Sequence, residues 1–189
     1  MGVKLYPNSR LVNRIETLIL PLDWTSFLSS AEAQLTGATT PSIPTYDTAV
    51  AAYILGGSQV GTGTTANIFW VIITLPTVYI PGTNLTVSMD DIYVLAGDAV
   101  IVAATLDLEA FPYDRTNGDF SNADINATVA QAIAAAFATD SFTLTGTNLT
   151  AEQQILLRFT SSVQITSAGG AGTGRNGFNF PRITYTGRI

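Results

Sequence analysis

Carboxylates are the first candidates for chemistry in this sequence, because the chain contains neither cysteine nor histidine. Disulfides, thiol chemistry, the usual zinc sites and every mechanism with an imidazole base are therefore excluded. Among the common catalytic designs, a carboxylate pair or a carboxylate-bound calcium or magnesium ion remains.

A candidate calcium site lies in one polar loop that carries Asp114, Asn117, Asp119 and Asp124. Calcium binds several carboxylate and amide oxygens, but the spacing is not that of an EF-hand. A solvated turn needs the same residue types, and this is the interpretation that we favour. We therefore expect no metal and no other cofactor.

Two acidic pairs are candidates for general acid-base work. Asp107 and Glu109 are two residues apart and share one face of a predicted strand, at the ~7 Å expected between alternate residues. Asp90 and Asp91 are adjacent and point to opposite faces. Two acids on the outer face of a strand are ordinary sheet surface, so we predict no catalytic residue and no enzyme.

Aromatic side chains suggest a different activity, because flat rings on a sheet bind sugars. Trp70 lies in the most apolar segment and is predicted to be in the core. Tyr79 and Tyr113 lie close to prolines in loops, and we expect them to be exposed ligand contacts. A carbohydrate-binding or receptor-binding module is therefore an alternative function.

Positive charges gather at the two ends of the chain, whose net charge is −6. Six of the eight basic residues are Lys4, Arg10, Arg14, Arg175, Arg182 and Arg188, and the segments 1–14 and 175–189 that carry them contain no acid. One interpretation is that the terminal strands lie side by side and neutralise an acidic body. The other is that the ends bind an acidic partner. The acidic body disfavours nucleic-acid binding.

The composition is typical of β-structure, since the chain has 27 threonines and a single lysine. Threonine suits pleated strands, whereas surface helices are usually rich in Glu and Lys. The length of 189 residues predicts one core domain, with residues 1–20 as a basic arm or strand and 21–189 as the β-sandwich. No apolar run reaches the ~20 residues of a membrane span, and no signal peptide is evident, so we expect synthesis in the cytoplasm.

Strands are expected wherever apolar residues alternate with polar ones. A long strand over 100–110 would place Val100, Val102 and Ala104 on one face, and a bulge is expected at Asp90 and Asp91. Two segments have helical character: a short turn within 24–35, and 124–138, which has the strongest helix propensity in the chain. Seven or eight short strands predict an all-β, antiparallel, jelly-roll-like β-sandwich with at most one or two short helices. The expected strands are 11–20, 50–55, 67–75, 85–95, 100–110, 141–145, 155–165 and 178–186.

Several short segments, in this order, resemble a family of β-sandwich structural proteins encoded in the genomes of tailed bacteriophages. They cover roughly two thirds of the chain and contain no catalytic signature. In that family the segment corresponding to 130–133 is extended, which opposes the helix expected from propensity. The matching segments are IFWVIITLP (68–76), YIPGTNLTV (79–87), ATLDLEAF (104–111), AQAI (130–133), DSFTLTG (140–146), and LT (149–150) leading into ILLRF (155–159).

The resemblance implies a virion structural protein that decorates or cements the capsid. Its partners would be the major capsid protein and further copies of itself, as a trimer or dimer, with no nucleic acid and no membrane. It would be made in the bacterial host cytoplasm and reside on the capsid surface, attached in part by the basic arm. The alternative is a carbohydrate-binding or receptor-binding module of a phage fibre or tail.

Overall fold

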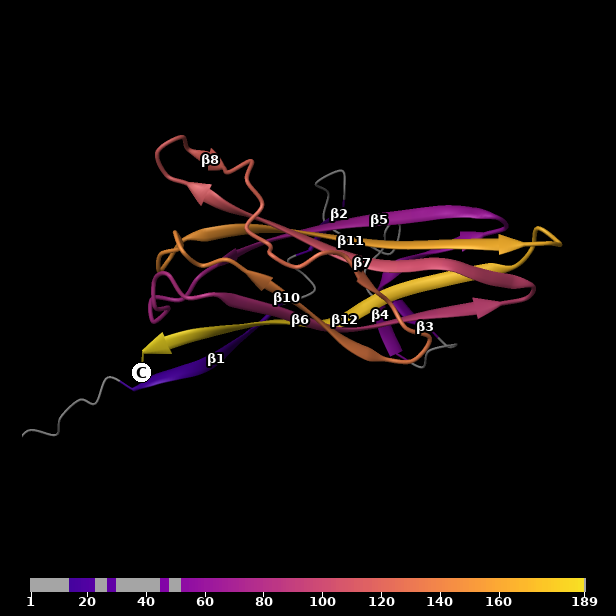
Figure 1. Ribbon diagram of the computed structural model, residues 1–189, viewed down its shortest axis with the longest axis horizontal. Helices are drawn as coiled ribbons and strands as arrows, with labels where there is room; N and C mark the ends of the chain where they lie inside the picture. Colours follow the sequence, from indigo (N-terminus) through magenta and orange to yellow (C-terminus); the bar gives the residue numbers. More distant parts are fainter. Residues whose placement is uncertain (1–13, 23–26, 30–44, 48–51, 189) are drawn as a thin grey trace, which may run out of the picture.

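The computed structural model describes residues 14–22, 27–29, 45–47 and 52–188. Within these residues every regular element is a β-strand, and the strands form two antiparallel sheets that pack face to face (Figure 1). The described part of the chain has no helix that is long and apolar enough to cross a membrane. The protein is an all-β, jelly-roll-like sandwich.

The first sheet has the strand order β10-β6-β12-β4-β3, and β1 pairs with the distal half of β12. The second sheet has the order β2-β5-β11-β7-β8, and β9 pairs with β7. The first sheet contains β1 (Ile15–Pro21), β3 (Thr45–Asp47), β4 (Ala52–Val60), β6 (Leu85–Ala96), β10 (Ala138–Leu144) and β12 (Thr173–Arg188). The second contains β2 (Leu28–Ser29), β5 (Gly63–Thr74), β7 (Ala99–Asp114), β8 (Asp119–Phe120), β9 (Gln131–Ala132) and β11 (Gln154–Ser167).

The core lies between the sheets and is built by strict alternation. In β11, Ile155, Leu157 and Phe159 are fully buried, whereas the residues between them reach the outer face. Aromatic rings fill the centre: the ring centroids of Phe159 and Phe178 are 5.2 Å apart, and those of Phe69 and Phe178 are 5.7 Å apart. These pairs join the two sheets, because Phe178 belongs to β12 and the other two to the second sheet.

The helix expected over 124–138 is wrong, and β9 within it is extended, as the phage-family resemblance implies. The backbone of this segment forms hydrogen bonds with neighbouring strands: Ala127 N donates to Thr143 O, and Ile133 N donates to Ala104 O. The Asp124 carboxylate also accepts from Ala110 N. Tertiary hydrogen bonds therefore override the local propensity of this alanine-rich segment.

The second expected helix lies largely outside the described residues, but Leu28 and Ser29 within it pair with Trp70 and Phe69 as strand β2. The bulge expected at Asp90 and Asp91 is also wrong. β6 is continuous there, and the irregularity lies on β12 between Asn179 and Arg182.

Strand β7 changes face part of the way along. Val100 and Val102 are 61% and 54% exposed, whereas Ala104 is buried. The register against β11 passes from Ala103 to Ile101, so Val102 is an extra residue. A bulge inverts the alternation, and the single apolar face expected over 100–110 is therefore wrong for its first residues.

Candidate functional site

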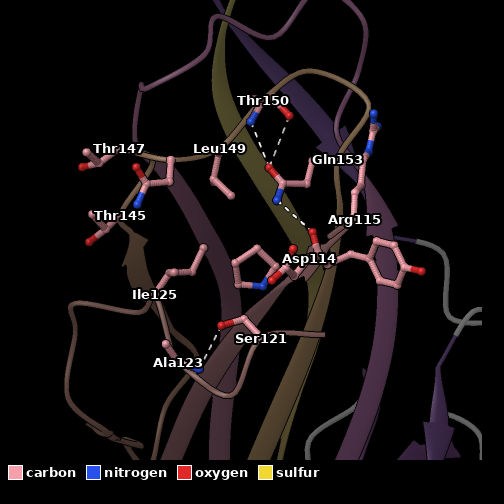
Figure 2. Close-up of a pocket in the computed structure, with 13 residues that line it drawn as sticks. Asp114, Arg115, Ser121, Ala123, Ile125, Thr145, Thr147, Leu149, Thr150 and Gln153 are labelled. Carbon is pink, nitrogen blue, oxygen red and sulfur yellow. Dashed lines mark hydrogen bonds between the residues drawn. The ribbon is translucent and has the colours of Figure 1, made fainter. Parts of the chain in front are cut away.

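A pocket of about 490 Å³ lies at the end of the sandwich where β7 leaves the second sheet (Figure 2). Three segments surround it: the end of β7, the loop that follows β8, and the connection between β10 and β11. Their lining residues are Pro112, Tyr113, Asp114, Arg115, Ser121, Ala123, Ile125, Thr145, Thr147, Asn148, Leu149, Thr150 and Gln153.

The lining combines an apolar base with a polar rim, in which Asp114 and Arg115 are charged. Leu149 is buried and belongs to the core, and Pro112 and Ile125 are partly buried. Thr147 and Asn148 are exposed and line the pocket from the connection between β10 and β11. Pockets that bind small ligands commonly have this combination of an apolar surface and a few polar groups.

Gln153 connects two walls of the pocket through hydrogen bonds of its side chain. Its side-chain oxygen accepts from Thr150 N at 3.0 Å, and its Nε2 donates to Tyr113 O at 3.1 Å. The preceding residue, Glu152, has a φ of 60°, in the left-handed region that non-glycine residues rarely occupy. Glu152 N nevertheless donates to Leu75 O, so the loop is held in this conformation by backbone bonding.

The other wall is fixed by backbone bonds as well. Ser121 N donates to Pro112 O at 2.8 Å, and Thr145 N donates to Ile125 O at 2.8 Å. Ala123 N donates to the Ser121 hydroxyl at 3.0 Å. These bonds fix the position of the segment that carries Thr145 and Thr147, which lie at the edge of the pocket (Figure 2).

The four candidate calcium ligands are engaged locally. Asp114 accepts from Thr116 N at 2.8 Å and from Asn117 Nδ2 at 2.6 Å, and these bonds, led by that from Thr116, lower the pKa of its carboxyl. Asp119 accepts from Phe120 N, and Asp124 from Ala110 N and Asn126 N. Among the described residues no group of three or more acidic side chains is placed to hold a metal ion. These hydrogen bonds are of the kind that Asp and Asn side chains form in turns.

The two predicted ligand-contacting tyrosines have different positions. Tyr79 is only 2% exposed, so the expectation that it is an exposed contact is wrong. Its hydroxyl donates to Thr83 O, and burial raises the pKa of its phenol. Tyr113 does line the pocket, and its ring also packs edge-on against Phe120 with centroids 5.4 Å apart.

Strand pairing brings residues 15–21 beside 182–188, so the first and last described strands are neighbours, as one of the two sequence interpretations proposed for the terminal strands. β1 pairs with β12 so that Ile15 lies opposite Arg188 and Pro21 opposite Arg182. Arg14 forms an ion pair with Glu16. Arg175 is exposed near the other end of β12. Lys4 and Arg10 lie outside the described residues, and binding of a partner by any of these groups stays a prediction.

Sequence reasoning misplaced Trp70, which is partly exposed on the outer face of the second sheet. Arg158 lies over its ring at 5.5 Å and over the Phe111 ring at 5.9 Å, and it forms an ion pair with Glu109. Asp107 and Glu109 do share this face, as predicted. Glu109 is engaged by Arg158 and Asp107 accepts from Leu108 N, so the two acids have separate structural partners.

The pocket as a whole was not predicted from the sequence. Its rim residues are ordinary turn residues, and only the pairing of β7 with β11 brings Pro112 beside the segment that contains Gln153. The available signal was the cluster of Gly146, Asn148 and Thr150, which indicates a turn and nothing more.

Comparison with known proteins yields no sequence family: no family model matches the chain, and no curated protein matches it. Solved structures do give matches. The xylan-binding module CBM15 is 15% identical, with a TM-score of 0.44, and the match covers 90% of this chain and 97% of that chain.

Two further solved structures match the chain. TmCBM61, solved in complex with β-1,4-galactotriose, is 8% identical with a TM-score of 0.36, over 92% of this chain and 88% of that chain. The enzymatically active domain of bacteriophage CBA120 tailspike protein 4 is 10% identical with a TM-score of 0.35, over 95% of this chain and 20% of that chain. All three TM-scores are below 0.5, and the ligands and activities in these names are those of the named proteins.

Proposed function

We propose that this chain is a non-enzymatic binding module that holds a neutral carbohydrate in the pocket at the end of the sandwich. The observation that carries the proposal is the lining, in which exposed hydroxyl and amide side chains surround the apolar surfaces of Pro112, Ile125 and Leu149. A pyranose has hydroxyl groups at its edge and C–H groups on its faces. The pocket volume of about 490 Å³ lies within the usual range for small ligands.

The charges at the pocket favour a neutral sugar over an acidic one. Asp114 and Arg115 are the charged residues among those that line it. Asp114 already accepts two local hydrogen bonds, and Arg115 donates to Glu152 O at 3.3 Å. With one carboxylate in the lining, no pair of acids is available there for glycoside hydrolysis. The proposed role is therefore binding, as part of a phage fibre or tail.

A glycan array followed by calorimetry tests this proposal. The double variant Thr147→Ala, Asn148→Ala removes two exposed polar side chains from the rim. Losing two hydrogen bonds to a ligand should weaken binding roughly tenfold or more. Thr166→Ala is the matched control, because Thr166 is an exposed threonine at the opposite end of β11. An array without specific hits, or equal affinity in the double variant and the wild type, would contradict the proposal.

Capsid decoration is a second candidate, favoured by a different surface. The outer side of β1 carries Ile15 and Ile19, which are 62% and 63% exposed, and on that face Arg188 lies beside Ile15. Exposed apolar side chains beside positive charge suit a protein partner with an acidic surface. The partner would be the major capsid protein or another copy of this chain.

Copy number separates the two candidates. Quantitative mass spectrometry of purified particles should find hundreds of copies for a decoration protein and only a few for a fibre or tail module. Replacing Ile15 and Ile19 with Thr should reduce particle binding only in the first case. Full occupancy by that variant would contradict attachment through β1.

A further inference from the structure

Asp91 is a carboxylic acid buried between the two sheets. Its side chain is 0% exposed, and it lies on the core face of β6, with Met89 before it and Phe178 opposite it on β12. Among the described residues, neither of its carboxyl oxygens has a hydrogen-bond partner. An ionised carboxylate without donors is strongly disfavoured in such a place.

Asp140 is the partner of Asp91 across the pairing of β6 with β10. In the register Asp140 lies opposite Met89 and Ala138 lies opposite Asp91, so the two acids are diagonal neighbours on one face. Oδ2 of Asp140 is also buried without a hydrogen-bond partner. Two carboxyl groups that face each other attract only when a proton lies between them.

Within the part of the chain that the structure describes, no basic side chain contributes to the pKa of Asp91. Asp90, on the opposite face of β6, adds a further negative charge, and Tyr93 is two residues along on the same face as Asp91. On β12, Arg175 and Arg182 lie opposite Val94 and Ser88, which are on the outer face. The segment 133–137, which joins β9 to β10, contains no ionisable side chain. Burial, with the contributions of Asp140 and Asp90, raises the pKa of Asp91 to about 8.

The start of β10 depends on this contact. Further along, Thr143 has partners on both sides, since its carbonyl accepts from Ala127 N and its amide donates to the Thr128 hydroxyl. In the described residues, Ala138–Ser141 pair with β6 alone. We propose that Asp91 and Asp140 share a proton and that this shared proton stabilises the pairing of Ala138–Ser141 with β6. Loss of the proton then allows Ala138–Ser141 to separate from β6.

The direction of the pH effect follows from linkage. When the segment opens, water reaches Asp91 and its pKa returns toward the ordinary value near 4, so opening releases a proton. The contact is therefore strongest in acid and weakens as the pH rises. The opening equilibrium should rise about tenfold per pH unit between about pH 4 and about pH 8, and level off above that.

Hydrogen exchange and chemical denaturation across this pH range test the proposal, with Asp91→Asn as the main variant. An amide at this position stays neutral and can donate to Asp140, so the variant should lack the pH dependence. Relative to the variant, the wild-type unfolding constant should rise about tenfold per pH unit up to about pH 8. The amides of Ala138–Ser141 should show the same trend after correction for intrinsic exchange.

Asp107→Asn is the matched control, because Asp107 is a partly exposed carboxylate on the outer face of the second sheet. Its pH profile should parallel that of the wild type. Parallel profiles for the wild type and Asp91→Asn between about pH 4 and about pH 8 would overturn the proposal. If Asp91→Asn does not fold, infrared spectra of the wild type test the proposal instead. The carbonyl band of a protonated carboxylic acid should be present near neutral pH and vanish around pH 8, and its absence near neutral pH would equally overturn the proposal.

Discussion

The two outer faces of the sandwich are stabilised in different ways. On the first sheet, strand pairing places Thr184 beside Thr86 and Ser88 beside Ser141, so short hydroxyl side chains lie next to one another on this face. On the second sheet, Trp70, Arg158 and Glu109 form one row across β5, β11 and β7. The first face mixes hydroxyl side chains with charged groups such as Asp90, Arg175 and Arg182, whereas the second concentrates its interactions in a few large side chains.

This difference indicates which surface side chains contribute most to the free energy of unfolding. Hydroxyl side chains lose little conformational entropy and add little hydrogen-bond energy, so each of them matters slightly. A tryptophan below an arginine buries large apolar areas and adds a cation–π contact and an ion pair. We therefore expect substitutions on the second sheet to have larger effects than equivalent ones on the first.

The largest effect is expected for Trp70→Ala. Loss of the ring should lower the free energy of unfolding by about 2 kcal/mol, through lost burial and the lost contact with Arg158. Denaturant titration measures this. Trp70→Phe is a sharper variant, because the indole N–H is buried without an acceptor and the phenyl ring removes it. A cost for Trp70→Phe as large as that for Trp70→Ala would contradict this account.

A smaller effect is expected for Arg158→Met, which keeps much of the apolar stem and removes the charge. The expected loss is about 1 kcal/mol, since the ion pair with Glu109 is partly exposed and such pairs contribute little. Adding salt should narrow the gap between the wild type and the variant in thermal melts. Thr184→Ala on the first sheet serves as the reference, with a change within about 0.5 kcal/mol. Equal losses of unfolding free energy for Arg158→Met and Thr184→Ala would show that the two faces do not differ.

The smallest effect concerns the hydroxyl face itself. The hydroxyl oxygens of Ser88 and Ser141 are 2.9 Å apart and form a hydrogen bond. Ser88→Ala should cost about 0.5–1 kcal/mol, and a double-mutant cycle with Ser141→Ala should give a coupling energy below about 1 kcal/mol. A coupling of about 2 kcal/mol or more would mean that the hydroxyls form a cooperative network.

Much of the sandwich could be predicted because alternation is a local property. The buried residues Ile155, Leu157 and Phe159 are visible in the sequence as every second residue of one segment. The same reasoning failed at Trp70, since Ile68, Trp70 and Ile72 are as apolar as the residues between them. In a run that is apolar throughout, the alternation of side chains assigns residues to two faces of the strand but does not show which face is buried.

The candidate site was predicted only in fragments. Tyr113 and Asp114 were selected from the sequence, and both line the pocket. Gln153 was not, because its role depends on reaching Tyr113, which is 40 residues away in the sequence. Asp91 was recognised as facing away from Asp90, but its burial beside Asp140 follows from the pairing of β6 with β10.

By itself, the sequence determined the β-class, the approximate positions of the long strands, the absence of thiol and imidazole chemistry, and the concentration of positive charge at both ends. These follow from composition and from a period of two, which act over a few residues. The tertiary structure alone decided which strands are neighbours, and with them the pocket, the partly exposed position of Trp70 and the buried acid pair. Strand pairing is a sum of weak contacts between distant segments, and no single residue type encodes it.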